Sequence, residues 1–211
     1  MPFIKSLTCG VLETNAYLFG LDTDKRVILL DAPQGCFDRV SAVLEETECR
    51  LEAVFITHAH FDHIQDLGYF AENNTPIYAH SASRDGIANP QIFDMIGRPN
   101  YEYPKGKISV LLEGGDSVSV AGLEIEVLEV PGHTQDSLAY YIPSYSLCFV
   151  GDLIFRDSVG RTDLPGGDFD QLAESIQTKI YSLDDSTIIY PGHGPSTKVG
   201  SEKRSNPFVR G

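Results

Sequence analysis

The sequence has few basic residues: 16 Lys and Arg stand against 30 Asp and Glu, which gives a net charge of −14 over 211 residues. Nucleic acids and anionic membranes both require a basic face on the protein that binds them. The shortage of basic residues therefore argues against both as partners. We interpret the acidic excess as a source of solubility.

Cysteine is also scarce, and none of the four cysteines forms a C-x-x-C pair. In a chain of this size we expect free, buried thiols rather than a disulfide framework. No apolar run reaches the length of a transmembrane helix, and the first ten residues, MPFIKSLTCG, lack the apolar core of a signal peptide. We therefore expect a cytoplasmic protein.

Linker-like and low-complexity segments are missing too, so residues 1–211 are expected to form a single domain. Short β-rich segments bounded by Gly, Pro and Asp predict strands. These segments are 13–20, 25–33, 51–57, 76–80, 137–142, 146–152 and 186–190, together with a hairpin over 117–130 that turns at Ala121 and Gly122.

Apolar spacing predicts three helices. The first covers 36–48. The second follows Asp62, with Asp62 as its N-cap and Gln65 completing a capping box. The third carries Leu172, Ile176 and Ile180 on one face. Residues 85–105, rich in Gly, Pro and Asn, are expected to form a long loop that acts as a lid or a binding loop.

Histidine is rare as well, with six in the chain, yet half of them crowd into THAHFDHI at residues 57–64. His58, His60 and His63 surround Asp62 directly behind the apolar run LEAVFI. Packing gives no reason for such a cluster. Neutral imidazole and carboxylate are the ligands that zinc and similar ions prefer, so the cluster predicts a metal site.

Three further strands end in a glycine followed by a metal-ligand type of residue: Gly132-His133, Gly151-Asp152 and Gly192-His193. The glycine lets the backbone turn tightly after the strand, so that the next side chain points into a space shared by neighbouring strand ends. Five histidines and two aspartates are too many ligands for one ion and about right for two. We expect one ion to be held by His58, His60 and His133, a second by Asp62, His63 and His193, and both by a bridging Asp152.

Two other residues near strand ends are interpreted differently. His80 lacks the glycine turn and is expected to be structural. Asp31, at the end of VILLDAP, either orients a ligand loop or caps a turn, and the sequence leaves both possibilities open.

The segments THAHFDH, PGHT, GD and PGHG at these separations resemble the metallo-β-lactamase superfamily. The histidine after the aspartate resembles its hydroxyacylglutathione hydrolase (glyoxalase II) branch, and residues 159–183 and 188–208 are most similar to its small single-domain bacterial members. True β-lactamases commonly have a Cys where Asp152 stands here. The resemblance covers nearly the whole chain and implies an α/β fold, a four-layer αββα sandwich with two mixed sheets flanked by helices.

Two divalent ions ~3.5–4 Å apart supply a hydroxide near neutral pH and take up the charge of a tetrahedral intermediate. A thiolate, with an unperturbed pKa near ~8.5, leaves without a proton donor. We therefore expect a binuclear hydrolase that cleaves hydroxyacylglutathione-type thioesters by attack of a metal-bridging hydroxide. Asp62 and Asp152 are counted as catalytic, and zinc is the first choice of metal, with iron or manganese able to occupy the same ligands.

Arg161 falls where the family has a lysine that reaches the substrate, whereas Asp163 falls where it has a tyrosine. Arg161 is expected either to bind a substrate carboxylate through its guanidinium or to pair with Asp163 or Asp157. Alternative functions are an iron-dependent persulfide dioxygenase, whose single iron uses two histidines and one aspartate, a lactone or ester hydrolase, and a metal-binding module without catalysis. The expected partner is a small thioester or ester, and the oligomeric state is left open.

Overall fold

The computed structural model describes residues 2–21, 23–88 and 105–211. The chain divides into two compact units. Unit 1 comprises Met1–Leu112 and Ser119–Leu123, and unit 2 comprises Glu113–Val118 and Glu124–Gly211. The single domain expected from the sequence stays a prediction.

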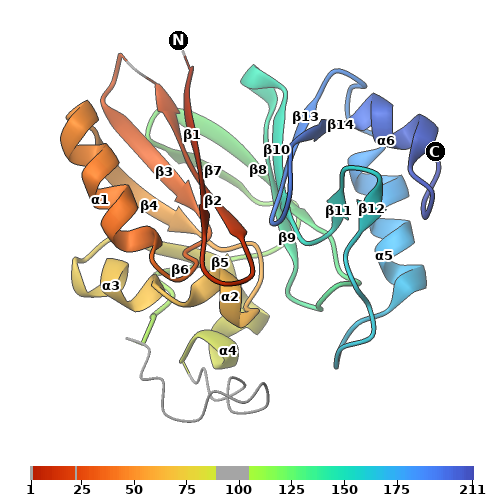
Figure 1. The fold of residues 1–211 in the computed structure, drawn as a ribbon, viewed down its shortest axis with the longest axis horizontal. Helices are drawn as coiled ribbons and strands as arrows, with labels where there is room; N and C mark the ends of the chain where they lie inside the picture. Colours follow the sequence, from red (N-terminus) through yellow and green to blue (C-terminus); the bar gives the residue numbers. More distant parts are fainter. Residues whose placement is uncertain (1, 22, 89–104) are drawn as a thin grey trace. The chain divides into compact units, whose positions relative to one another are not determined.

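Unit 1 contains a six-stranded mixed sheet whose strands lie side by side in chain order (Figure 1). The first three strands are antiparallel neighbours, whereas the third to the sixth run parallel. The strands are β1 (Pro2–Cys9), β2 (Thr14–Leu21), β3 (Arg26–Leu30), β4 (Arg50–Phe55), β5 (Ile77–His80) and β6 (Val110–Leu112). Parallel neighbours need crossover connections, and these connections carry the helices of the unit.

The helices of unit 1 pack on one face of its sheet. Val40 and Val43 of α1 and Phe70 of α3 lie in one apolar cluster with Leu29 and Val54 of the sheet. Burial of an aliphatic side chain is worth ~1.5–3 kcal/mol, so this cluster fixes the strand ends from which the loops leave. The helices are α1 (Cys36–Thr47), α2 (Phe61–Ile64), α3 (Leu67–Glu72) and α4 (Arg84–Ala88), with a 3₁₀ turn η1 (Ser81–Ser83).

A buried carboxylate, Asp66, joins two of these loops. Its Oδ2 accepts the N–H of Phe37 in the first turn of α1 at 2.9 Å, and its own N–H donates to the carbonyl of Ala32 at 2.9 Å. The N–H of Ala32 in turn donates to the carbonyl of His63 at 2.7 Å. Burial raises the pKa of Asp66, although the N–H groups at the start of α1 oppose that shift. The loop after β3 is therefore locked to the segment that carries the histidine cluster.

Two sequence predictions in unit 1 are corrected. The helix near Asp62 begins two residues earlier, at Phe61, with His60 as N-cap and no side-chain cap bond, so the capping box with Gln65 is wrong. The physical reason is that the carboxylate of Asp62 accepts the hydroxyl of Thr14 at 2.7 Å instead of capping the helix. Residues 85–88 of the expected loop are helical in α4, and its residues 89–104 lie outside the described residues.

Unit 2 holds most of a second six-stranded mixed sheet, in the order β14-β13-β10-β9-β8-β7. The central strands β10 and β13 are parallel, and β9 and β14 are antiparallel to them. The strands are β7 (Ser117–Val120), β8 (Leu123–Glu129), β9 (Leu138–Ile142), β10 (Leu147–Gly151), β13 (Ile188–Pro191) and β14 (Thr197–Lys198). The predicted turn between β7 and β8 is confirmed, because Ala121 (φ 55°) and Gly122 (φ 77°) are both left-handed, as a tight hairpin requires.

The remaining elements of unit 2 include one helix that the sequence predicts and several that it does not. Leu172, Ile176 and Ile180 are fully buried in one apolar cluster with Cys148 and Ile189 of the sheet, which confirms the predicted helical face. A π-helical turn in its second half was not expected. The elements are α5 (Phe169–Ser175), the π turn η4 (Ile176–Ile180), α6 (Val199–Ser205), the 3₁₀ turn η3 (Pro143–Tyr145) and the small hairpin β11 (Ile154–Phe155) and β12 (Ser158–Val159).

All four cysteines are free thiols, as expected; Cys9, Cys36 and Cys148 are buried and Cys49 is half-buried. Burial raises the pKa of the Cys36 and Cys148 thiols, which keeps them protonated and unreactive. Within residues 2–21, 23–88 and 105–211, no helix combines the length and the apolar character needed to cross a membrane.

Candidate metal centre

The histidine cluster lies between β4 and α2 of unit 1. We call its four side chains, His58, His60, Asp62 and His63, half-site 1. His58, Asp62 and His63 are buried, and His60 is half-buried. Buried imidazoles beside a buried carboxylate are costly unless each is held by a partner, so their hydrogen bonds indicate what the cluster is built to do.

Asp31 fixes the proton positions of two of these histidines. Its Oδ2 accepts the Nδ1–H of His63 at 2.7 Å and the hydroxyl of Thr57 at 2.9 Å. Because the Thr57 hydroxyl donates its single proton to Asp31, it accepts the Nδ1–H of His58 at 3.0 Å. Both histidines are thereby held with the proton on Nδ1 and the lone pair on Nε2, the state in which imidazole binds a metal. Of the two roles that the sequence leaves open for Asp31, the orienting one is observed.

The spacing of donor atoms in half-site 1 fits metal ligation. His58 Nε2 lies 3.1 Å from His60 Nδ1, and His63 Nε2 lies 3.6 Å from Asp62 Oδ2. Two ligands at ~2.0–2.2 Å from one tetrahedral ion are ~3.3–3.6 Å apart. The His63–Asp62 pair has this separation, and the His58–His60 pair is slightly closer.

Thr14, at the start of β2, is a site residue that the sequence analysis missed. It is buried, and its hydroxyl donates to Asp62 Oδ2 at 2.7 Å from a position 48 residues away in the chain. The bond aims one carboxylate oxygen of Asp62. A threonine in a strand gives no sequence signal for such a role, because the contact is made only by the fold.

Unit 2 brings together the three strand-end residues that the sequence predicts, and we call His133, Asp152 and His193 half-site 2. Asp152 Oδ2 lies 3.7 Å from His133 Nε2 and 3.4 Å from His193 Nε2. One carboxylate oxygen thus stands at ligand-pair distance from the imidazole nitrogen of His193 and slightly farther from that of His133. The bridging role expected of Asp152 stays a prediction.

The segment after Asp152 orients His133. The backbone carbonyl of Arg161 accepts the Nδ1–H of His133 at 2.7 Å, which leaves the Nε2 lone pair available. Gly160 lies close to both Asp152 and His133. A Cβ at this position would lie 1.8 Å from the carbonyl oxygen of Asp152 and 3.3 Å from His133 Nδ1. Only a glycine fits there, and the sequence analysis missed this residue because an isolated glycine has no distinctive pattern.

The strand-end glycines behave as predicted in two of three loops. Gly132 (φ 131°) and Gly151 (φ 53°) are left-handed and turn the chain into His133 and Asp152. Gly132 also has no room for a side chain, because a Cβ would lie 2.2 Å from the backbone of Leu172. In the third loop the left-handed glycine is Gly194 (φ 71°), one residue after His193.

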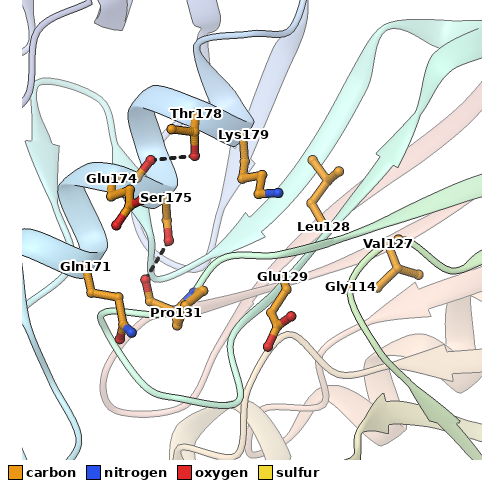
Figure 2. A pocket seen from close by; sticks show the side chains of 11 residues that line it. Gly114, Val127, Leu128, Glu129, Pro131, Gln171, Glu174, Ser175, Thr178 and Lys179 are labelled. Carbon is orange, nitrogen blue, oxygen red and sulfur yellow. Dashed lines mark hydrogen bonds between the residues drawn. The ribbon is translucent and has the colours of Figure 1, made fainter.

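A cavity of about 520 Å³ is lined by Pro131, two residues before His133, and by residues of α5 (Figure 2). Figure 2 shows Ser175 of α5 donating to the carbonyl of Pro131, a bond of 2.7 Å. The described residues that line it include none of the predicted ligands. The cavity is therefore not the predicted site, but its helical wall holds the turn before His133 in place.

The guanidinium of Arg161 forms an ion pair within the chain and is not left open for a substrate carboxylate. Its Nε and Nη2 donate to the two carboxylate oxygens of Asp163 at 2.7 and 2.8 Å, and both side chains are exposed. Of the expectations for Arg161, the ion pair with Asp163 is the one observed. Its backbone carbonyl, not its guanidinium, contacts half-site 2.

His80 has the structural role expected of it. Its Nδ1 accepts the N–H of Ala82 at 3.0 Å and so caps the 3₁₀ turn that follows β5. The histidine is buried at the end of its strand. A capping bond explains its position without a metal.

Comparison with known proteins places these half-sites in a family context. The model of the metallo-beta-lactamase superfamily matches residues 9–193. The hydroxyacylglutathione hydrolase GloC of Haemophilus influenzae is 32% identical over 193 residues, covering 89% of each chain. The probable metallo-hydrolase YqgX of Bacillus subtilis is 31% identical over 208 residues, covering 98% of this chain and 97% of its own.

Solved structures show the same fold. BLEG-1, a B3 metallo-beta-lactamase, has a TM-score of 0.91 at 32% identity, covering 99% of this chain and 100% of its own. TTHA1623 in a di-iron-bound form has a TM-score of 0.84 at 34% identity, covering 97% and 100%. ETHE1 from Myxococcus xanthus has a TM-score of 0.81 at 29% identity, covering 98% and 84%. The predicted fold class is confirmed, and the chain carries His and Asp groups that could bind a metal ion.

Proposed function

The chain belongs to the metallo-β-lactamase superfamily, and we propose that it is a binuclear metal-dependent hydrolase whose preferred substrates are hydroxyacylglutathione-type thioesters. The observation that carries the proposal is the position of Asp152 Oδ2, at 3.7 and 3.4 Å from the Nε2 atoms of His133 and His193. A carboxylate oxygen that lies close to two imidazole nitrogens supports a two-ion site.

We propose that the two half-sites act together. One ion would be held by His58, His60 and His133, the other by Asp62, His63 and His193, with Asp152 shared between them. The described geometry fits this division, because His58 and His60 form one close donor pair and Asp62 and His63 form the other. Two bound divalent ions would supply a water of lowered pKa and polarise the substrate carbonyl.

The protein's own contribution to this chemistry is orientation. Asp31, Thr57 and the Arg161 carbonyl hold three imidazoles in the tautomer that presents Nε2. The hydroxyl of Thr14 orients the carboxylate of Asp62 through a hydrogen bond. Groups fixed before the reaction cost no reorganisation during it, which is the main source of electrostatic catalysis.

A thioester is the preferred substrate class because of its leaving group. A thiolate, with an ordinary pKa near ~8.5, departs at neutral pH without a proton, whereas an amine must be protonated as it leaves. In the proposed division every carboxylate and imidazole of the two half-sites is a ligand, so the site suits a reaction that needs no extra acid. The similarity to GloC of Haemophilus influenzae supports the glutathione thioester in particular.

An iron-dependent persulfide dioxygenase is the second candidate, favoured by the likeness to ETHE1. A single iron with two histidines and one aspartate would leave other donors unused. His63 is held by Asp31 in the tautomer of a ligand, and His193 lies 3.4 Å from Asp152. Side chains arranged in this way favour two ions. The di-iron form of TTHA1623 makes iron, besides zinc, a metal to be tested.

A parallel assay of zinc-loaded and iron-loaded protein tests the proposal. Thiol release from S-D-lactoylglutathione, oxygen uptake with glutathione persulfide and opening of a chromogenic β-lactam are followed with the same preparations. We expect thiol release as the fastest reaction, abolished in Asp152→Asn. Oxygen uptake by the iron form without thioester cleavage by either form would replace the hydrolase with the dioxygenase. If β-lactam opening were the dominant activity, as for a B3 metallo-beta-lactamase such as BLEG-1, β-lactams would replace thioesters as the proposed substrates.

A further inference from the structure

The C-terminal segment STKVGSEKRSNPF, residues 196–208, has no part in ligation, yet it contains a buried ionisable group. Glu202 of α6 is 1% exposed and Asn206 is fully buried. Asn206 Nδ2 donates to Glu202 Oε2 at 2.9 Å across one helical turn. We call these two residues the Glu202–Asn206 pair. A buried carboxylate is costly unless donors surround it, so the other donors indicate its purpose.

The first of these donors belongs to the β11–β12 hairpin. The N–H of Asp157 donates to Glu202 Oε2 at 3.0 Å, and Asn206 Nδ2 also donates to the carbonyl of Ser158 at 3.0 Å. Asp157 has a left-handed backbone (φ 57°), which a non-glycine residue adopts at a cost. The Glu202–Asn206 pair therefore stabilises the strained turn between β11 and β12 through hydrogen bonds from α6.

That hairpin connects the parts of half-site 2. Asp152 precedes it, and Gly160 and Arg161, which orient His133, follow it. Within the hairpin, the ring of Phe155 meets the ring of His193 edge-on, with centroids 6.1 Å apart. A displaced hairpin would therefore move the surroundings of all three ligands of half-site 2.

The second donor belongs to the loop after His193. The hydroxyl of Thr197, at the start of β14, donates to Glu202 Oε1. The guanidinium of Arg156 in the hairpin turn donates to the carbonyl of Ser196 in the same loop. The Glu202 carboxylate thus joins the loop that follows His193 to the hairpin that follows Asp152, with one oxygen on each.

We propose that Glu202 is a positioning residue that sets half-site 2 before metal binds. Its carboxylate fixes the loops on either side of the site, so that Asp152, His133 and His193 keep their mutual distances without an ion. Ligands fixed in advance bind more tightly, because less order is lost on binding. The loop-fixing role stands on the contacts alone, and its consequence for metal rests on the proposed function.

The chemistry of the three donors predicts a graded response to substitution. In Glu202→Gln the amide oxygen can keep the bonds from Asp157 and Asn206, and the Thr197 hydroxyl can turn to accept from the amide NH₂. In Glu202→Ala all three bonds to the carboxylate are lost, and Asn206 Nδ2 keeps only its bond to the carbonyl of Ser158. Glutamine should therefore retain most of the positioning and alanine should lose it.

The test compares the full-length chain with Glu202→Ala and Glu202→Gln by amide hydrogen exchange without metal and by zinc competition titration. Tyr181→Phe is the control, because it removes one buried bond, Tyr181 Oη to the carbonyl of Val209 at 2.7 Å, to which neither loop contributes a group. We expect peptides from 152–161 and 192–198 to exchange at least 10-fold faster in Glu202→Ala, with zinc affinity at least 10-fold weaker. Glu202→Gln should lie near the native chain, and Tyr181→Phe should change neither loop.

Two outcomes would overturn the proposal: unchanged exchange in the two loops of Glu202→Ala, or exchange that is equally faster throughout unit 2 rather than in these two loops. Failure of the proposed function has a different signature. If the native chain binds no zinc while Glu202→Ala still loosens the two loops, the metal-dependent hydrolase is refuted and the positioning of the loops by Glu202 is upheld.

Discussion

A single buried carboxylate orients two of the four donors in half-site 1. Asp31 binds the Nδ1–H of His63 directly and that of His58 through the hydroxyl of Thr57. In Asp31→Asn the side chain keeps its shape, but its NH₂ can face an imidazole N–H and release the fixed tautomer. Loss of such an orienting partner typically costs about 10–100-fold in metal affinity. We expect a loss of that size in competition with a chromogenic chelator.

The control for this prediction is Asp38→Asn, the same chemical change at an exposed position in the first turn of α1. Thermal unfolding of both variants without metal separates a folding defect from a ligand defect. Equal metal affinity in Asp31→Asn and Asp38→Asn would refute the orienting role of Asp31.

The exposed ion pair of Arg161 and Asp163 makes a prediction about pH. The hydrogen bond from Arg161 lowers the pKa of Asp163 from 3.8 to about 2. The pKa of Asp163 is lower in the folded chain than in the unfolded chain. The contribution of the ion pair to the free energy of unfolding is therefore complete above pH 3.8 and is lost as the pH falls through about 2. Water and salt screen so exposed a pair, so its effect on stability is small.

NMR titration of the Asp163 carboxyl should give a midpoint near pH 2, and Arg161→Ala should return the midpoint toward 3.8. An ordinary midpoint in the native chain would mean that the guanidinium is not engaged with Asp163 in solution. Arg161 would then be available to bind a substrate carboxylate, and the ion pair would cease to argue against that role.

At the scale of elements, the chain that leaves the β11–β12 hairpin passes close to Asp152 and His133, because Gly160 has no side chain. A Cβ at Gly160 would meet the Asp152 carbonyl oxygen at 1.8 Å and His133 Nδ1 at 3.3 Å. Overpacking of a tight site costs ~1–3 kcal/mol or more, and the backbone must move to relieve it. We expect Gly160→Ala to lower the Tm and to weaken zinc binding at least 10-fold, as measured by thermal unfolding and chelator competition.

Gly35→Ala is the corresponding control. Gly35 is left-handed (φ 79°), but nothing lies within 4 Å of a Cβ there, so alanine adds backbone strain without a clash. A Tm loss with unchanged zinc affinity is expected. If Gly160→Ala also keeps full zinc affinity, the space beside Asp152 and His133 has no bearing on the site.

The strands and the ligand-type residues that follow them could be predicted from the sequence, because both depend on local patterns. Apolar runs followed by Gly-His or Gly-Asp predict both the strand and the direction of the next side chain, and His133 after β8 and Asp152 after β10 follow that pattern. The bonds that orient the ligands were not accessible. Thr14 meets Asp62 across 48 residues and Asp31 meets His63 across 32, so only the fold brings them together. The capping box failed for the same reason, because the distant threonine takes the carboxylate.

Local pattern also fails where an element is short. The two-residue strands β11, β12 and β14 have no periodicity to detect, although the first two form the hairpin beside half-site 2. The π turn η4 is hidden in a different way. Its buried residues Ile176 and Ile180 keep the four-residue spacing of an ordinary helix, so the sequence predicts the buried face without the change in backbone.

For the whole molecule, the proposed centre links the number of bound metal ions to the free energy of unfolding. Half-site 1 belongs to unit 1 and half-site 2 to unit 2, and we propose that they share two ions. An ion that binds only the folded chain stabilises it by ~2.7 kcal/mol when free metal is 100 times Kd. Metal analysis of the native chain, reconstituted with zinc, should therefore give two ions per chain, and removal by a chelator should lower the Tm.

Asp152→Asn separates this proposal from a single-ion site. If Asp152 Oδ2 is shared, replacing the carboxylate weakens both ions, so the variant should lose zinc at both positions and all hydrolysis. His80→Asn is the control, because asparagine can keep the capping bond to Ala82 while removing an imidazole from the same fold. It should retain two ions and full activity. A ceiling of one ion in the native chain, or an Asp152→Asn variant that keeps one ion at native affinity, would show that Asp152 serves one position and that the second ion was wrongly inferred.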